Sequence, residues 1–134
     1  KMATEILIND GGAPARILPF IAGEAIAAGD ALAVGNDGEI IQAQTTHAHG
    51  AGHIEYMIGV ALTSAASGEP CNVVSGKGII VNCNVEDVTE GKGLKVGTTT
   101  AGRLAPSIVL GHTCAVCLED TGTVGLHKIM IIGG

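Results

Sequence analysis

The stretch ALAVGNDGEII, residues 31–41, decides the fold class of this chain. Two short apolar runs flank Asn36, Asp37 and Gly38, and these residue types tolerate the positive φ angles that tight hairpin turns require. The stretch therefore predicts a β-hairpin with strands over residues 31–34 and 39–43.

Short β-prone runs between glycine turns continue along the rest of the chain. Helix is scarce, because the Ala-rich residues 23–29 span only one or two turns with a glycine at each end. The spacing predicts an all-β fold, a small β-barrel or sandwich of short strands. The further strands are expected over residues 5–8, 16–21, 56–62, 71–74, 79–83, 94–96, 103–105, 113–118 and 126–132.

The hairpin has a second copy later in the chain. GDALAVG and GEI, within residues 29–40, align with GKGLKVG and GRL, within residues 91–104. After a loop, GVALTS (residues 59–64) resembles AVCLED (residues 115–120). One copy cannot bury its apolar face alone, so we expect two hairpin-plus-strand half repeats around one core. The alternative is that glycine-bounded hairpins look alike by chance.

Length and composition predict one domain with a weakly charged surface. The 134 residues fit a single β domain over residues 1–134. With one Phe, one Tyr and no Trp, the core must consist of Val, Ile, Leu and Ala. Charged residues make up 15% of the chain, against about 25% in an ordinary domain. Apolar surface left in water favours assembly with other copies or with a larger scaffold, although single Ala and Gly residues at a surface are also normal.

Two segments are expected to extend from this domain. An N-terminal arm over residues 1–14 joins a β-prone run to the breaker DGGAP, and a long, polar, His-rich loop covers residues 44–55. We expect residues 3–9 and 129–132 to make subunit contacts by strand pairing, because both are β-prone and lie near the chain ends.

The scattered positive charge argues against nucleic acid as a partner, and the short apolar runs argue against a membrane. The net charge is −6 and the Lys and Arg residues are scattered, so no basic patch for phosphates is visible. No apolar run reaches the 18 or so residues that a membrane helix needs, and the first residues contain no secretory signal pattern.

The motifs of common enzymes are absent from the sequence. The segments 76–78 and 91–93, each Gly-Lys-Gly, lack the spacing and the hydroxyl residue of a phosphate-binding loop. No Gly-x-Ser-x-Gly or His-Glu-x-x-His motif occurs. We therefore predict no catalytic residues, no cofactor and no enzymatic activity.

The His-rich loop is the one constellation with chemical promise. His47, His49 and His53 are candidate metal ligands, since imidazole is a common ligand and residues two apart on an extended strand share a face. The segment is rich in glycine, and no Cys or carboxylate stands at diagnostic spacing, so no metal site is predicted. A small metal- or ligand-binding β-barrel stays an alternative function.

The four cysteines form no convincing metal or disulfide pattern. Cys114 and Cys117 make one CxxC pair, but zinc needs a second pair, and Cys71 and Cys83 are not spaced as one. We expect buried cysteines that act as small apolar side chains. The lone His112 and His127 are expected to be structural or exposed.

The chain resembles the phage capsid cement (decoration) proteins, a family sometimes mislabelled as RecA/RadA-like phage recombinase. The resemblance rests on IAAGDALAVG (residues 26–35) followed by IGVALTSAASGE (residues 58–69), and it extends over most of residues 20–110. The sequence departs from the family in its His-rich loop and in the apolar end KIMII, residues 128–132, which leaves the oligomeric state open.

This resemblance implies a structural virion protein, made in the host cytoplasm and bound to the capsid surface. It implies homo-oligomers, commonly trimers, that bridge neighbouring major capsid proteins and stabilise the shell. A subunit of a self-assembling filament or tube is the alternative in the same structural class, because head-to-tail contacts extend without closure.

Overall fold

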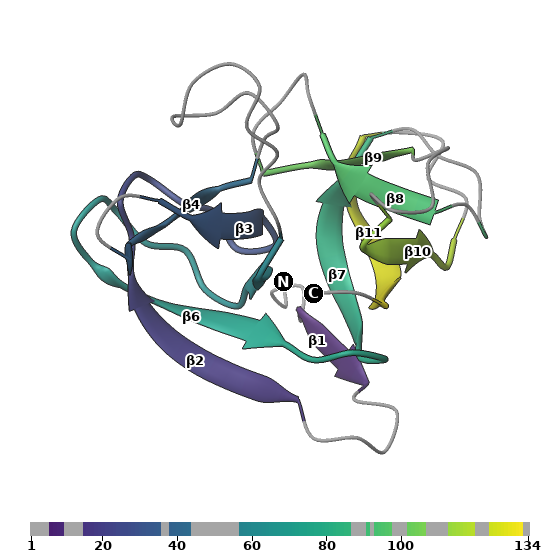
Figure 1. Cartoon of the computed structure of the whole chain (residues 1–134), viewed down its shortest axis with the longest axis horizontal. Helices are drawn as coiled ribbons and strands as arrows, with labels where there is room; N and C mark the ends of the chain where they lie inside the picture. The colour runs from purple at the N-terminus through teal and green to yellow at the C-terminus, as the bar shows by residue number, and fades with distance from the viewer. Residues whose placement is uncertain are drawn as a thin grey trace, which may run out of the picture.

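The computed structural model describes residues 6–9, 15–35, 38–43, 57–86, 91, 93–97, 102–106, 113–119 and 124–132. Over this part of the chain it contains eleven strands and no α-helix, and a strand occurs at every position where the sequence predicts one. No described segment is a helix long and apolar enough to cross a membrane. The all-β prediction is confirmed. Two sheets lie side by side, each curled into a lobe (Figure 1).

The first sheet contains five antiparallel strands, and its two edge strands meet. A parallel bridge joins Ala22, directly after β2, to Ile40 in β4, so the sheet curls on itself. The predicted hairpin is β3–β4, in which Leu32 lies opposite Gln42 and Val34 lies opposite Ile40. In spatial order the strands are β2 (Arg16–Ile21), β6 (Pro70–Ser75), β5 (Gly59–Ala61), β3 (Ala31–Val34) and β4 (Ile40–Gln42).

The second sheet curls in the same way. A parallel pairing of Val85 with Leu104 joins β7 to β9 and closes five of its strands. The sixth strand, β1, pairs with β7 at Ile80 and Val81, on the edge opposite β11. The order is β1 (Leu7–Asn9), β7 (Ile80–Val85), β11 (Gly125–Ile131), β10 (Ala115–Cys117), β8 (Gly93–Val96) and β9 (Leu104–Pro106).

The two sheets are structural repeats. The strands β2 to β6, here the first half, pair in the same order as β7 to β11, the second half. The Gly29 amide donates to the Ala61 carbonyl at 2.8 Å, and the Gly91 amide donates to the Cys117 carbonyl at 2.7 Å. Both glycines have positive φ, 92° and 80°. The predicted half repeats are therefore confirmed in the register that the sequence alignment gave.

Small aliphatic side chains from equivalent positions build the core. Leu32 and Leu94 are fully buried on β3 and β8, and Ile40 and Leu104 are fully buried on β4 and β9. One cluster of buried residues lies within the first half, and a larger one fills the second half and the space between the sheets. The composition of the core agrees with the shortage of aromatic residues.

Three expectations from the sequence can be compared with particular segments of the structure. Residues 23–29 form no helix, because Ile26 pairs with Ala65 in an antiparallel bridge instead. The expected subunit contact through residues 129–132 is wrong, since β11 is paired on both edges, by β7 and β10, and Ile129 is fully buried. Of the predicted arm over residues 1–14, the described residues 6–9 belong to the domain, with Ile6 buried.

The halves meet at Asp30, a buried acidic side chain with 4% exposure. Its Oδ1 accepts a hydrogen bond from Asn84 Nδ2 at 2.8 Å, across the junction, and its Oδ2 accepts from Gln42 Nε2 at 2.7 Å. Oδ2 also accepts from the Ala27 amide at 2.9 Å. Three donors thus compensate the carboxyl group for the water that it loses on burial.

Candidate assembly surface

The strongest chemical candidates of the sequence lie outside the described residues. This applies to His47, His49 and His53, to the rest of the loop over residues 44–55, and to His112. Among the residues that are described, no three His, Cys, Asp or Glu side chains come together in a way that could hold a metal ion. The metal-binding alternative therefore stays a prediction from sequence alone.

The cysteines are the small core residues that the sequence predicts. All four are free, and Cys71, Cys83 and Cys117 are buried. Burial raises the pKa of Cys114 to about 11 and raises the pKa of Cys83 well above its usual value. A thiol must lose its proton to act as a nucleophile or a metal ligand. These side chains are therefore suited to packing and not to chemistry.

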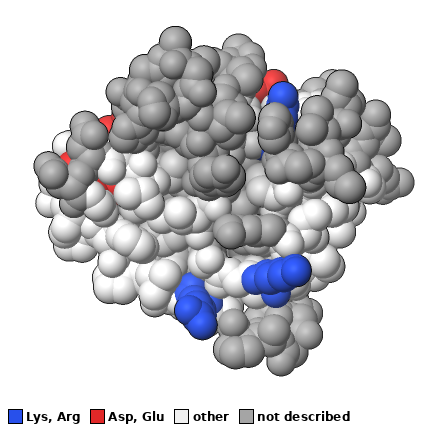
Figure 2. All heavy atoms as spheres, viewed as in Figure 1, with Lys and Arg blue, Asp and Glu red and all other residues white. Residues whose placement is uncertain are grey.

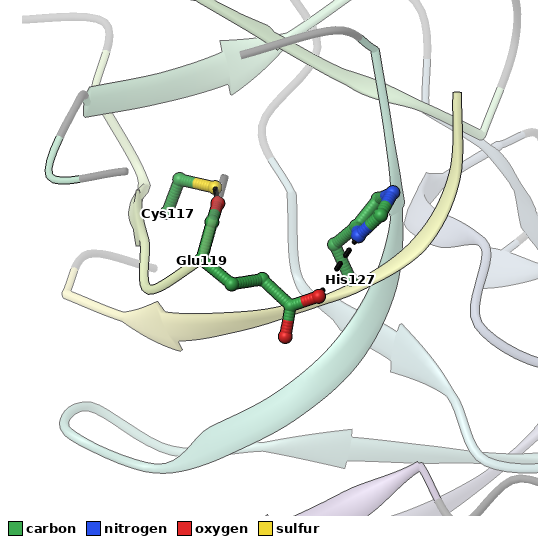
Figure 3. Close-up of polar contacts among 3 residues, drawn as sticks. All are labelled: Cys117, Glu119 and His127. Atoms are coloured by element: carbon green, nitrogen blue, oxygen red, sulfur yellow. Dashed lines mark hydrogen bonds and ion pairs between the residues drawn. The ribbon is translucent and has the colours of Figure 1, made fainter. Parts of the chain in front are cut away.

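His127 and Glu119 form a polar pair at the β10–β11 connection (Figure 3). His127 Nδ1 lies 3.0 Å from Glu119 Oε2, and the Cys117 thiol donates to the Glu119 carbonyl at 2.8 Å. The hydrogen bond from His127 lowers the pKa of the Glu119 carboxyl. His127, expected to be structural or exposed, thus makes a local polar contact with Glu119. The pair was missed in the sequence because only the β10–β11 register brings residues 119 and 127 together.

Strand β2 carries three of the four large apolar side chains that are exposed among the described residues of the first half, and the fourth is Val34 on β3. Ile17, Leu18 and Ile21 are 51%, 40% and 46% exposed. Because neighbouring residues of a strand point to opposite faces, β2 exposes apolar side chains on both of its faces. Several exposed apolar side chains on one strand make β2 a candidate surface for contact with another protein.

The equivalent strand of the second half shows what is unusual about β2. By the shared register, Leu18 corresponds to Val81, which is fully buried. Ile21 corresponds to Asn84, which bonds to Asp30. The first half therefore exposes apolar side chains where the second half has a buried residue and a polar tie to its neighbour.

The free edge of β2 lacks one backbone hydrogen-bond donor, at Pro19. The Ala22 amide donates to Glu69 on the β6 side, so by alternation the backbone of Pro19 faces the other edge. Its counterpart is Asn82, whose amide donates to the Ile6 carbonyl at 2.8 Å next to β1. Pro19 has no amide hydrogen to make that bond. A regular hydrogen-bonded ladder along the whole of β2 is therefore interrupted at Pro19.

The described surface around these strands carries few charges. In Figure 2 the described part of this face is mostly uncharged; Lys and Arg atoms stand out near its lower margin and at one place near the top, and Asp and Glu atoms lie at its upper and left margins. Such a face suits protein contact better than binding of a phosphate backbone.

The fold and this surface define a class: an all-β protein of two repeated, curled sheets with an exposed apolar strand at one side. A solved structure of the same fold is that of the N base of the head fiber protein gp8.5 of bacteriophage phi29. The two chains are 19% identical and superpose with a TM-score of 0.67, over 88% of this chain and 94% of the other. At this identity the likeness concerns the fold. No protein-family model and no curated protein sequence matches the chain.

Proposed function

We propose that this chain is a non-enzymatic structural protein of a bacteriophage particle that attaches to the outside of the head. The observation that carries the proposal is the shared fold with the head fiber N base, which extends over 88% of the chain. The proposal agrees with the resemblance to capsid cement proteins expected from residues 26–35 and 58–69, a family for which no model matches the chain.

In its finer form, the proposal is that the protein bridges capsomers and stabilises the shell. Ile17 and Leu18 supply exposed apolar area on β2. Burying apolar area against major capsid proteins contributes about 25 cal/mol per Å². Many bound copies add to the work needed to separate capsomers, since a ligand that binds only the intact shell shifts its stability by mass action.

The test is binding to empty heads assembled from the major capsid protein of the phage that encodes this chain. Labelled protein is mixed with the heads and sedimented, and bound copies per head are counted together with the temperature at which the heads break apart. We expect saturable binding and a higher disruption temperature. Absence of binding at micromolar protein concentrations would contradict head attachment.

Variants of β2 test the surface. The substitution Ile17→Asp with Leu18→Asp places charge on both exposed faces of the strand and should lower head affinity at least about tenfold. Val124→Asp is the matched control, because Val124 is 47% exposed but lies in the second half, away from β2. Equal loss of binding in both variants would show that β2 is not the attachment surface. Binding with no rise in disruption temperature would reject the bridging role alone.

A further inference from the structure

The contact between the two halves is not reciprocal. From the second half, the Asn84 amide donates to the Gly29 carbonyl at 2.9 Å. Gly102, in the β8–β9 turn, inserts between two strands of the first half: its carbonyl accepts from the Ala31 amide at 2.8 Å, and its amide donates to the Ala43 carbonyl at 2.9 Å. Each half thus uses a different set of residues toward the other.

The shared register identifies the equivalent residues that this contact leaves unused. Ile21 and Gly38 in the first half correspond to Asn84 and Gly102, and we call this pair the inserting face. Gly91, Gly93 and Pro106 in the second half correspond to Gly29, Ala31 and Gln42, and we call them the receiving face. The correspondences follow from the paired hydrogen bonds and strand registers of the two sheets.

The glycines that take part in the contact are covered and two of their counterparts are open, whereas Gly93 is half-buried, with Thr113 Cγ2 3.0 Å from a Cβ built on it. Gly29 and Gly102 are buried, whereas Gly91 and Gly38 are exposed. Among the described residues, no atom lies within 4 Å of a Cβ built on Gly38 or Gly91. Ile21 is 46% exposed, and Pro106 is exposed as well. The inserting face and the receiving face are therefore both accessible on the same molecule.

We propose that a second copy of this chain occupies these faces. The inserting face of one copy packs on the receiving face of the next and repeats the contact that joins the halves within a chain. A non-reciprocal contact leaves one complementary face at each end, and identical copies then join head to tail into a ring or a filament. This association is a property of the chain itself and does not depend on attachment to a head.

The residues at the inserting face suit a contact between separate chains. The Ile21 amide faces away from β6, because the next amide, that of Ala22, donates to Glu69 on the β6 side. It thus has the direction in which the Asn84 amide reaches Gly29. Ile21 is apolar, whereas its counterpart Asn84 is polar. Burial of the Ile21 side chain between two copies supplies association energy, which the contact within one chain does not need.

Association between separate copies depends on protein concentration, because no covalent link joins them. Residues 76–79 connect the two halves of one chain, so their contact forms at a high effective concentration. Separate copies lack this connection, and the same contact between them dissociates on dilution.

The test uses one charged substitution on each face. Ile21→Arg blocks the inserting face, Pro106→Arg blocks the receiving face, and Val124→Arg is the control outside both. Sedimentation velocity over a range of concentrations should show oligomers for the wild type and for Val124→Arg, and monomers for the other two. An equal mixture of Ile21→Arg and Pro106→Arg should form a dimer, because each variant keeps the face that the other has lost.

Three outcomes would overturn the proposal. A wild type that stays monomeric at millimolar concentration rules out the second copy, and oligomers that persist in both variants place the interface elsewhere. If the mixture fails to form a dimer, association uses the same face on both partners and not the head-to-tail contact. Circular dichroism and thermal unfolding confirm that each variant folds; if Ile21→Arg does not, Ile21→Asp, which places a smaller charged side chain on the same face, replaces it.

Discussion

The side-chain amide of Asn84, on β7, donates to Oδ1 of the buried Asp30 carboxyl group at 2.8 Å and so ties the two halves together. The aligned position of Asp30 in the second half is Lys92 in the sequence. The repeat is therefore symmetric in its strands and asymmetric at its junction. This difference makes the junction testable without disturbing the sheets.

Removing the Asp30 carboxyl group should destabilise the whole fold. Asp30→Ala leaves three part-buried donors without their acceptor, and we expect a loss of about 3 kcal/mol in the free energy of unfolding. Asn84→Ala removes one donor and should cost about 2 kcal/mol. Urea denaturation measures both. Lys77→Ala, at an exposed position, is the control and should stay within about 0.5 kcal/mol of the wild type; a similar value for Asp30→Ala would mean that the junction contributes little.

A Cβ methyl group should destabilise the fold at Gly59 but stabilise it at the equivalent position, Ala115. A Cβ on Gly59 would lie 2.5 Å from the Val74 carbonyl oxygen and 2.6 Å from Val73 Cγ1. Since a backbone carbonyl in a central strand cannot move aside, Gly59→Ala should cost about 3 kcal/mol. Ala115→Gly, at the equivalent position, should cost only about 1 kcal/mol. Thermal unfolding of the pair decides the matter, and a neutral Gly59→Ala would show that β5 can shift away from β6.

The thiols of Cys83 and Cys114 should be almost inert in the folded protein. With a pKa of about 11, Cys114 is about one part in a thousand thiolate at pH 8, against about a quarter for an ordinary cysteine. We expect reaction with a disulfide reagent at least about 100-fold slower than for a free thiol, and reaction of all four cysteines in denaturant. Reaction of either thiol within seconds in the native protein would contradict this packing.

The Glu119–His127 pair should give a small, pH-dependent contribution to stability. The folded state lowers the pKa of Glu119, so its contribution is present above the unfolded value of about 4.3 and is lost as the pH falls through the lower folded value. Because Glu119 is 42% exposed, solvent screening limits the effect to about 0.5 kcal/mol. Denaturation of wild type and Glu119→Gln should differ by this amount at pH 6 and converge near pH 3. A gap that widens toward pH 3 would contradict the assigned sign.

The strands were predictable because their signals are local. Asn36, Asp37 and Gly38 between apolar runs mark the β3–β4 turn whatever surrounds them, and glycines at equal spacing marked the second copy. Exposure was not predictable, because it depends on distant segments. Leu18 and Val81 occupy the same place in their halves, and only the assembled fold covers one and exposes the other.

The sequence indicated the kind of candidate site, a surface for assembly, but not its location. Low charge and a small aliphatic core indicated assembly, but the β-prone end at residues 129–132 gave the wrong surface, because the same β propensity suits a central strand as well as an edge. Gly38 and Gly102 look equivalent in sequence and have φ of 77° and 83°. That one is inserted and the other open depends on how the halves meet.

Under the proposed attachment to a phage head, where many copies would gather, Pro19 has a consequence. Crowded edge strands with free amides and carbonyls readily join into cross-β aggregates. At the middle of the exposed edge of β2, the proline ring interrupts the ladder that such growth requires. The apolar side chains of β2 can thus be offered for binding, while Pro19 interrupts the continuous backbone ladder that cross-β growth along this strand would need.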